Sequence, residues 1–162
     1  MQTEQDLEKL VRTYTAPLLR YCTAMLGNEA DAQDAVQTTF VKAWLRRHTL
    51  RGDGQDNERA WLYRIAYRTA LDILRTAKRA EQRKPPEAAV PDPGITESLR
   101  DALNALDPLD RALVLERVLD GMDYATLARI HHRPEGYLRT RYHRAKRRLA
   151  DLLEKEGFCH DT

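Results

Sequence analysis

The most constraining feature of this chain is a pair of helical patterns separated by a short break, in residues 123–153. Asp123 is a good N-cap residue, and apolar residues recur after it at helical spacing up to Ile130. Pro134 suits the start of a second helix, where its missing N–H has no partner to lose. The second pattern has apolar residues spaced four, three, four and three apart, which form one seam: Leu138, Tyr142, Ala145, Leu149 and Leu152. We therefore predict two packed helices joined by a tight turn.

The outer face of the second helix is strongly basic. Residues 139–148 carry six positive charges and no acid. The charges by themselves are also consistent with a helix whose basic face is only exposed to solvent. The short helix before it and the Pro134-Glu135-Gly136 start favour a helix-turn-helix, whose second helix lies in the major groove of DNA. Arginine can pair there with guanine through two hydrogen bonds, so we expect this helix to read DNA.

Composition limits what else the chain can do. Its 162 residues suffice for one or two small domains, and a net charge of +2 requires any nucleic-acid surface to be local. No apolar run approaches the ~20 residues of a membrane span, and the N-terminus lacks the layout of a secretory signal. Cys22 and Cys159 lie far apart and suggest no disulfide framework, and no metal-site spacing is formed by His131, His132, Cys159 and His160. We expect a cytoplasmic protein without membrane insertion, metal or cofactor, and no nucleophile–base set or phosphate loop indicates an enzyme.

Three amphipathic helices are expected in the first half, over residues 3–26, 31–47 and 58–83. Pro17 should kink or split the first of them, and Cys22 falls on its apolar face. The third helix is basic, because residues from Arg64 to Lys84 include seven Lys or Arg and only two acids.

A proline-rich segment divides the chain. Lys84 to Gly94 holds four prolines, which sustain neither helix nor strand. Two more helices are expected after it, over 96–106 and 109–120, the latter with Leu109, Ala112, Leu113 and Leu119 on its inner side. No strand pattern occurs, so the fold class is all-α, with two small helical domains joined by a Pro-rich linker and the helix-turn-helix in the C-terminal domain. The expected bounds are 1–84 for the first domain, 85–96 for the linker and 97–157 for the second domain.

Three strings of residues occur in an order that resembles a known family. They are Asp-Ala-x-Asp-x-Val-Gln-x-x-Phe at 31–40, Trp-Leu-Tyr-Arg-Ile-Ala at 61–66, and Pro-Glu-Gly through Arg-x-x-Arg-Ala at 134–145. With the proline-rich gap, they make nearly the whole chain resemble bacterial RNA polymerase sigma factors of the extracytoplasmic-function class, group IV of the sigma-70 family. The resemblance implies a factor that binds core RNA polymerase and directs promoter-specific initiation. Promoter DNA and an anti-sigma factor are the other partners that it implies.

The resemblance also implies roles for the N-terminal residues. In such factors the second helix docks on a coiled coil of the largest polymerase subunit, and Asp34, Gln37 and Phe40 match that pattern, although Phe40 also suits core packing. The loop over 48–58 would capture a base flipped from the non-template strand. Trp61 could stack a base, but a Trp on an apolar seam is more often core. The residues expected at the melted minus-ten element are Trp61, Arg64, Arg68, Arg75, Lys78 and Arg79.

The C-terminal helix-turn-helix would read the minus-thirty-five element. Within it, Arg141 and Arg147, together with Lys146, suit phosphate contacts or solvent better than base contacts. The residues expected at this element are Tyr137, Arg139, Thr140, Arg141, His143, Arg144 and Arg147.

Two other functions stay open on the residues alone. A DNA-binding regulator would use the same helix-turn-helix with a helical sensor domain and without polymerase, and a helical adaptor would bind only protein. The turn also departs from the family pattern. His132 and Arg133 stand where a glycine and an apolar residue are usual, so His132 is expected to adopt a positive φ. Tyr137 replaces a small hydroxyl residue, so the promoter sequence read is expected to differ from that of better-known relatives.

Overall fold

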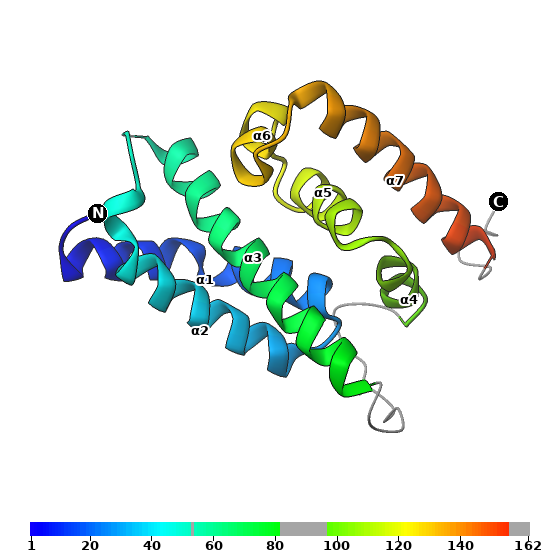
Figure 1. Ribbon diagram of the computed structural model, residues 1–162, viewed down its shortest axis with the longest axis horizontal. Coiled ribbons are helices and arrows are strands. Elements are labelled where there is room, and N and C mark those ends of the chain that lie inside the picture. Colours follow the sequence, from blue (N-terminus) through cyan, green and yellow to red (C-terminus); the bar gives the residue numbers. More distant parts are fainter. Residues whose placement is uncertain (53, 82–96, 156–162) are drawn as a thin grey trace.

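The computed structural model describes residues 1–52, 54–81 and 97–155, which form α-helices and short connections (Figure 1). Within those ranges no strand occurs. The expected linker at 85–96 and Cys159 lie outside the described residues. The helices are α1 (Glu4–Leu26), α2 (Glu29–Leu45), α3 (Gln55–Glu81), α4 (Glu97–Ala105), α5 (Pro108–Val118), α6 (Tyr124–His131) and α7 (Glu135–Lys155), with one 3-10 turn at Arg47–Thr49. Among the described residues, no helix is long and apolar enough to cross a membrane.

The first three helices pack side by side. Thr3 begins α1 with a capping box shared with Asp6, and Gly27 ends it in the left-handed conformation at φ 83°. Asn28 then caps α2 by accepting a hydrogen bond from the Asp31 amide. The first helix was expected to kink or split at Pro17, and it does not split there, because α1 continues through this residue. Packing of this helix in the core outweighs the local cost of the proline.

The second half contains the expected helix-turn-helix, formed by α6 and α7. Asp123 caps α6 through the Thr126 amide, and His132 ends it with a φ of 53°, as predicted from the sequence. The apolar seam of α7 is also confirmed, because Leu138, Tyr142 and Ala145 are buried.

One expectation for α5 is wrong. Leu119 is 45% exposed, whereas Glu116 is fully buried. Since α5 ends at Val118, Leu119 lies beyond the helix and does not follow its inner face.

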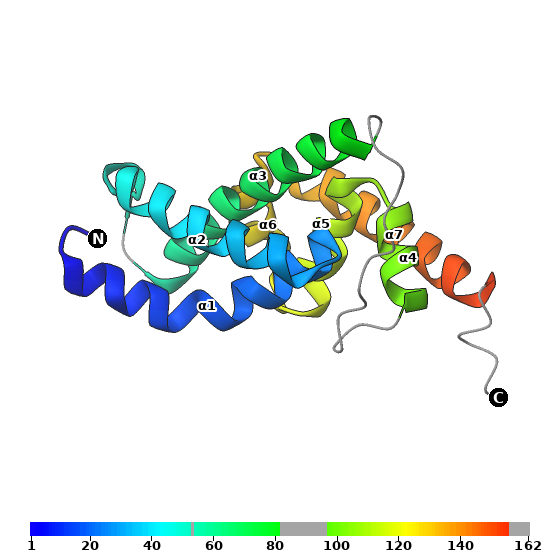
Figure 2. The ribbon, with the colours of Figure 1, turned by 90° about the horizontal axis from the view of Figure 1, so that it is seen from below.

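The two halves lie against each other. Figures 1 and 2 both show α6 close to α3, and Figure 1 shows α5 and α6 between α3 and α7. Their apolar residues form one continuous buried cluster, which includes Cys22 and Met25 of α1, Leu113 of α5 and Ile130 of α6. Buried Arg111 of α5 donates to the carbonyl of Met25 as well as to the carbonyls of Asn104 and Leu106, at the C-terminal end of α4 and just after it. The second half is therefore held directly on α1 and α3, and the helix-turn-helix meets α3 through α6.

Candidate nucleic-acid interface

The outward face of α7 carries the residues expected to read DNA. At about 100° per residue, Thr140, His143 and Arg147 point directly away from the buried seam. Arg144 lies toward one flank, and Arg139 lies toward the other. All five of these side chains are exposed, so the structure brings them together on one surface of α7.

Arg141 is held differently from its neighbours. Its guanidinium donates to Asp107 and Asp110, which precede and begin α5, and to the Tyr137 hydroxyl at 2.7 Å. Partial burial opposes its charge, but the hydrogen bonds with Asp110 and Tyr137 raise the pKa of Arg141 overall. Asp107 makes no capping bond to α5, because its carboxylate pairs with Arg141 instead. Arg141 and the 42% exposed Tyr137 therefore fasten one flank of α7 to α5.

The other flank of α7 meets α6 through aromatic contacts. The Cζ atom of Arg139 lies 4.7 Å from the ring centre of Tyr124, the first residue of α6. Arg117, near the end of α5, lies over the same ring at 4.4 Å. Sequence periodicity did not indicate this contact, because these three residues belong to three different helices.

A second basic surface runs along α3. At about 100° per residue, Arg64, Arg68, Arg75, Lys78 and Arg79 share one side of this helix. Arg68, Arg75, Lys78 and Arg79 are exposed, and Arg75 makes only an exposed ion pair with Asp72 at 3.8 Å. Trp61 starts the same side but is partly buried, and its Nε1 donates to the Thr49 hydroxyl at 2.9 Å.

The N-terminal part of this basic surface lies against the helix-turn-helix. Nη1 of Arg64 donates to the carbonyl of Ile130 at 2.8 Å, and burial followed by the nearby Arg68 lowers the pKa of Arg64. Burial, followed by Arg64 and Arg68, also lowers the pKa of His132 in the turn. In this arrangement α6 covers Arg64, while the basic residues farther along α3 stay open.

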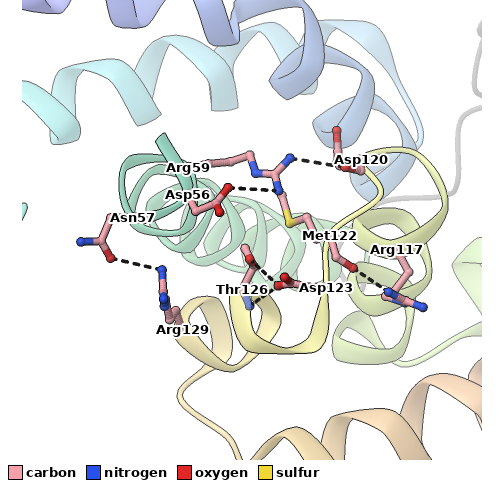
Figure 3. Close-up of polar contacts among 9 residues, drawn as sticks. All are labelled: Asp56, Asn57, Arg59, Arg117, Asp120, Met122, Asp123, Thr126 and Arg129. Carbon is pink, nitrogen blue, oxygen red and sulfur yellow. Dashed lines mark hydrogen bonds and ion pairs between the residues drawn. The ribbon is translucent and has the colours of Figure 1, made fainter. Parts of the chain in front are cut away.

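Figure 3 shows how the loop before α6 meets the start of α3. Arg59 of α3 donates to the carbonyl of Asp120 at 3.4 Å, and Arg129 of α6 donates to Asn57 at 3.3 Å. Asp123 accepts from the Thr126 amide at 2.8 Å, which fixes the first turn of α6. The helix-turn-helix is thus oriented by polar contacts at both ends of α6.

The outer face of α2 contains the residues expected to dock on polymerase. Asp34 and Gln37 are exposed, whereas Phe40 is partly buried against the core. Val41 and Leu45 share the face of Asp34 and are 59% and 65% exposed. Sequence analysis missed these two residues, because an apolar residue on an amphipathic helix is read first as core. Their exposure makes them candidates for the same surface.

The loop after α2 has a hollow that sequence analysis could not define. It has a volume of about 360 Å³ and is lined by Met1, Gln2, Arg47, His48 and Leu50. Among the described residues no group of three or more His, Cys, Asp or Glu side chains is placed to hold a metal ion.

Comparison with known proteins decides the family. Residues 10–80 match the family description "Sigma-70 region 2", and residues 96–149 match "Sigma-70, region 4". The ECF RNA polymerase sigma factor SigL of Mycobacterium tuberculosis is 30% identical over 162 residues, covering 93% of this chain and 90% of SigL. The chain belongs to the ECF RNA polymerase sigma factors. The factor BldN of Streptomyces coelicolor is also 30% identical, over 92% of this chain. The present chain spans only 61% of the length of BldN.

Solved structures agree with this family in fold. The sigma factor RpoE, in a complex with the anti-sigma factor NepR from Bartonella quintana, has a TM-score of 0.75 at 23% identity, covering 93% of this chain and 98% of RpoE. CnrH, solved in complex with the cytosolic domain of CnrY, has a TM-score of 0.68 at 25% identity, covering 94% of this chain and 90% of CnrH. Region 2 therefore corresponds to α1–α3, and region 4 corresponds to α4, α5, α6 and most of α7.

Proposed function

We propose that this sigma factor binds core RNA polymerase in the cytoplasm and directs it to promoters. It reads the minus-thirty-five element with α6 and α7 and contacts the melted minus-ten element with α3. The observation that carries the proposal is that one chain presents two separate arginine-rich helical faces, one on α7 and one on α3. A regulator that reads duplex DNA alone needs only the first.

The minus-thirty-five surface is divided by what each side chain is free to do. The candidates for base contacts are exposed on the outward side of α7 and its two flanks, where side chains reach base edges in the major groove: Arg139, Thr140, His143 and Arg144. Arg147 and Lys146 are exposed farther along the helix and suit phosphate contacts. Arg141 supports the surface rather than reading a base, because its guanidinium is committed to Asp107 and Asp110.

The minus-ten surface follows the open part of α3. Arg68, Arg75, Lys78 and Arg79 contact the phosphates of the separated strand. Arg64 joins them only when α6 moves away, since its guanidinium is bound to the Ile130 carbonyl. Use of the whole basic side of α3, Arg64 included, therefore requires the two halves to separate. Trp61 holds Thr49 in the loop after α2, and the adjacent hollow near His48 is a site for the flipped base.

The docking surface for polymerase is the outer face of α2. Asp34 and Gln37 supply polar contacts, and Phe40, Val41 and Leu45 supply apolar area. Two large exposed aliphatic side chains on one helical face are typical of a surface that a partner covers. An anti-sigma factor is a further partner, as the resemblance to this class of sigma factors implies, and RpoE, which shares the fold, was solved in complex with the anti-sigma factor NepR.

A transcription experiment tests the proposal. Core polymerase and the full chain are incubated with a library of randomised promoters, and the transcribed sequences are recovered. The double variant Asp34→Ala/Gln37→Ala should reduce polymerase binding and transcription without loss of stability, because both side chains are exposed. The matched control is Gln5→Ala/Glu8→Ala, an exposed amide and acid with the same spacing on α1.

Three outcomes are informative. Recovery of a shared two-element promoter, with a defect only in the α2 variant, supports the proposal. Normal polymerase binding by the α2 variant would show that this face is not the docking surface. Sequence-specific binding to duplex DNA without any effect on polymerase would favour the helix-turn-helix regulator instead.

A further inference from the structure

The start of α6 presents one aromatic ring to two arginines. The Cζ atoms of Arg139 and Arg117 lie 4.7 and 4.4 Å from the centre of the Tyr124 ring. Arg139 belongs to α7 and Arg117 to α5, so this ring joins three helices of region 4. A guanidinium group is attracted to the negative face of an aromatic ring and packs well on its plane.

The ring is itself held in place, whereas Arg139 is exposed. Tyr124 is half-buried and meets the buried Tyr142 ring edge-on at 6.3 Å and 68°. Arg117 is anchored by a hydrogen bond of 2.8 Å to the Met122 carbonyl, which Figure 3 shows. Within the described part of the chain, no hydrogen bond or ion pair holds the Arg139 guanidinium, so the ring is what orients it.

We propose that Tyr124 is a positioning residue for promoter recognition, whose ring orients the Arg139 guanidinium for one base pair of the minus-thirty-five element. The inference rests on the proposed function of α7 as the recognition helix. An arginine that is free in solution adopts many rotamers and loses this freedom when it pairs with a base. A ring that holds it beforehand reduces that loss, and it also fixes the plane in which the two donors meet guanine.

The effect should appear in base preference rather than in overall affinity. Loss of one exposed cation–π contact corresponds to about a two- to fivefold change in an equilibrium constant. Tyr124→Leu should therefore reduce the preference at one base pair by about two- to fivefold and leave the other positions unchanged. Tyr124→Phe keeps the ring and should retain the wild-type preference.

The test uses the full chain with core polymerase and the promoter recovered from the library. Affinities are measured for every single-base change in the minus-thirty-five element with wild type, Tyr124→Leu, Tyr124→Phe, Arg139→Ala and the Tyr124→Leu/Arg139→Ala double variant. In the double variant, the Tyr124 change should have no further effect at the affected base pair, because its target is already gone. Leu149→Ala, which removes part of the α7 seam away from Tyr124, controls for a general loss of packing.

The outcomes separate this inference from the proposed function. Position-specific loss that vanishes without Arg139 supports it. The inference would be overturned if Tyr124→Leu lowered the affinity for every promoter variant equally, as Leu149→Ala does. It would also be overturned if the Tyr124 change had the same effect with and without Arg139. In both cases the proposed promoter recognition would still stand. An unchanged profile in Arg139→Ala would also overturn it. A chain with no preferred sequence would overturn both.

Discussion

The hydroxyl of Tyr21 in α1 donates a hydrogen bond of 2.8 Å to the carboxylate of Glu116 in α5, and both side chains are fully buried. The other Glu116 oxygen lies 2.6 Å from Nε2 of His131 in α6. The His131 ring packs edge-on against Tyr67 of α3, with 4.6 Å between the ring centres. One polar cluster thus joins region 2 to region 4 inside the shared core.

Removal of Glu116 should strongly destabilise the fold in which region 4 packs on region 2. Glu116→Ala leaves the Tyr21 hydroxyl and His131 Nε2 buried without their shared acceptor, and each buried polar group left unpaired costs about 1–3 kcal/mol. Urea denaturation of the full chain measures the change in the free energy of unfolding.

Tyr21→Phe is the milder comparison, because it removes one hydroxyl and keeps the ring that packs on Tyr63. It should cost about 1–2 kcal/mol. If the free energies of unfolding of Glu116→Ala and the wild type differed by less than about 1 kcal/mol, the cluster would not stabilise the packing of region 4 on region 2.

Asp120, in the loop before α6, should make stability depend on pH. Burial, partly offset by the Tyr63 hydroxyl, raises its pKa from 3.8 to about 6. One of its carboxylate oxygens, Oδ2, is buried without a hydrogen-bond partner. Between pH 4 and pH 6 the folded state therefore binds more protons than the unfolded state, and stability falls as the pH rises.

Asp120→Asn should remove this dependence and stabilise the protein at pH 7 by about 1–3 kcal/mol. Denaturation of both proteins at pH 4 and pH 7 checks the prediction, because the difference between them isolates the contribution of Asp120. The exposed Asp151 provides the control, Asp151→Asn, which should change stability little at either pH. An Asp120→Asn variant that is less stable at pH 7 would contradict the assignment.

His132 should be a position where glycine improves the fold. Its φ of 53° is left-handed, and an L side chain there costs about 1 kcal/mol. His132→Gly should stabilise the protein by about 0.5–1 kcal/mol after the greater freedom of the unfolded chain is included. Arg133→Gly is the matched change one residue later, where φ is not positive, and it should destabilise. Thermal unfolding distinguishes the two, and a lower melting temperature for His132→Gly would refute the strain argument.

The parts that sequence alone predicted are those that local rules determine. The spacing of Leu138 and Tyr142 defined the buried side of α7, and the missing glycine in the turn predicted the positive φ of His132. Both follow from the geometry of one helix or one turn.

The parts that sequence missed depend on partners far along the chain. Arg141 appeared to be one basic residue among several, but it pairs with Asp107 and Asp110, more than 30 residues earlier. Glu116 was not singled out from the sequence, because helical periodicity does not show that Tyr21 and His131 converge on it. Helical periodicity places a charged residue on the surface of its helix, but it does not show which distant residue will pair with that charge in the folded protein.

Arg144 should read a base, and Lys146 should bind a phosphate. Both side chains are exposed, but Lys146 lies about 200° around α7 from Arg144, toward the flank of the helix. A bidentate arginine–guanine pair supplies about 1–3 kcal/mol of discrimination, whereas a lost phosphate contact weakens all sequences about equally. Arg144→Ala should therefore flatten the preference at one minus-thirty-five position. Lys146→Ala should lower affinity for every promoter and reduce the salt dependence by about one charge.

Binding to single-base promoter variants at two salt concentrations distinguishes these two roles. Arg148→Ala is a useful comparison, because Arg148 is an exposed basic residue of α7 near Asp110 and outside the proposed reading surface. Arg148→Ala should leave the base preference unchanged and should lower the affinity only slightly, by a similar amount for every promoter. A uniform loss from Arg144→Ala with every preference retained would make Arg144 a phosphate contact. Base reading would then rest on Arg139 and His143, two other side chains of that surface that can donate to a base edge.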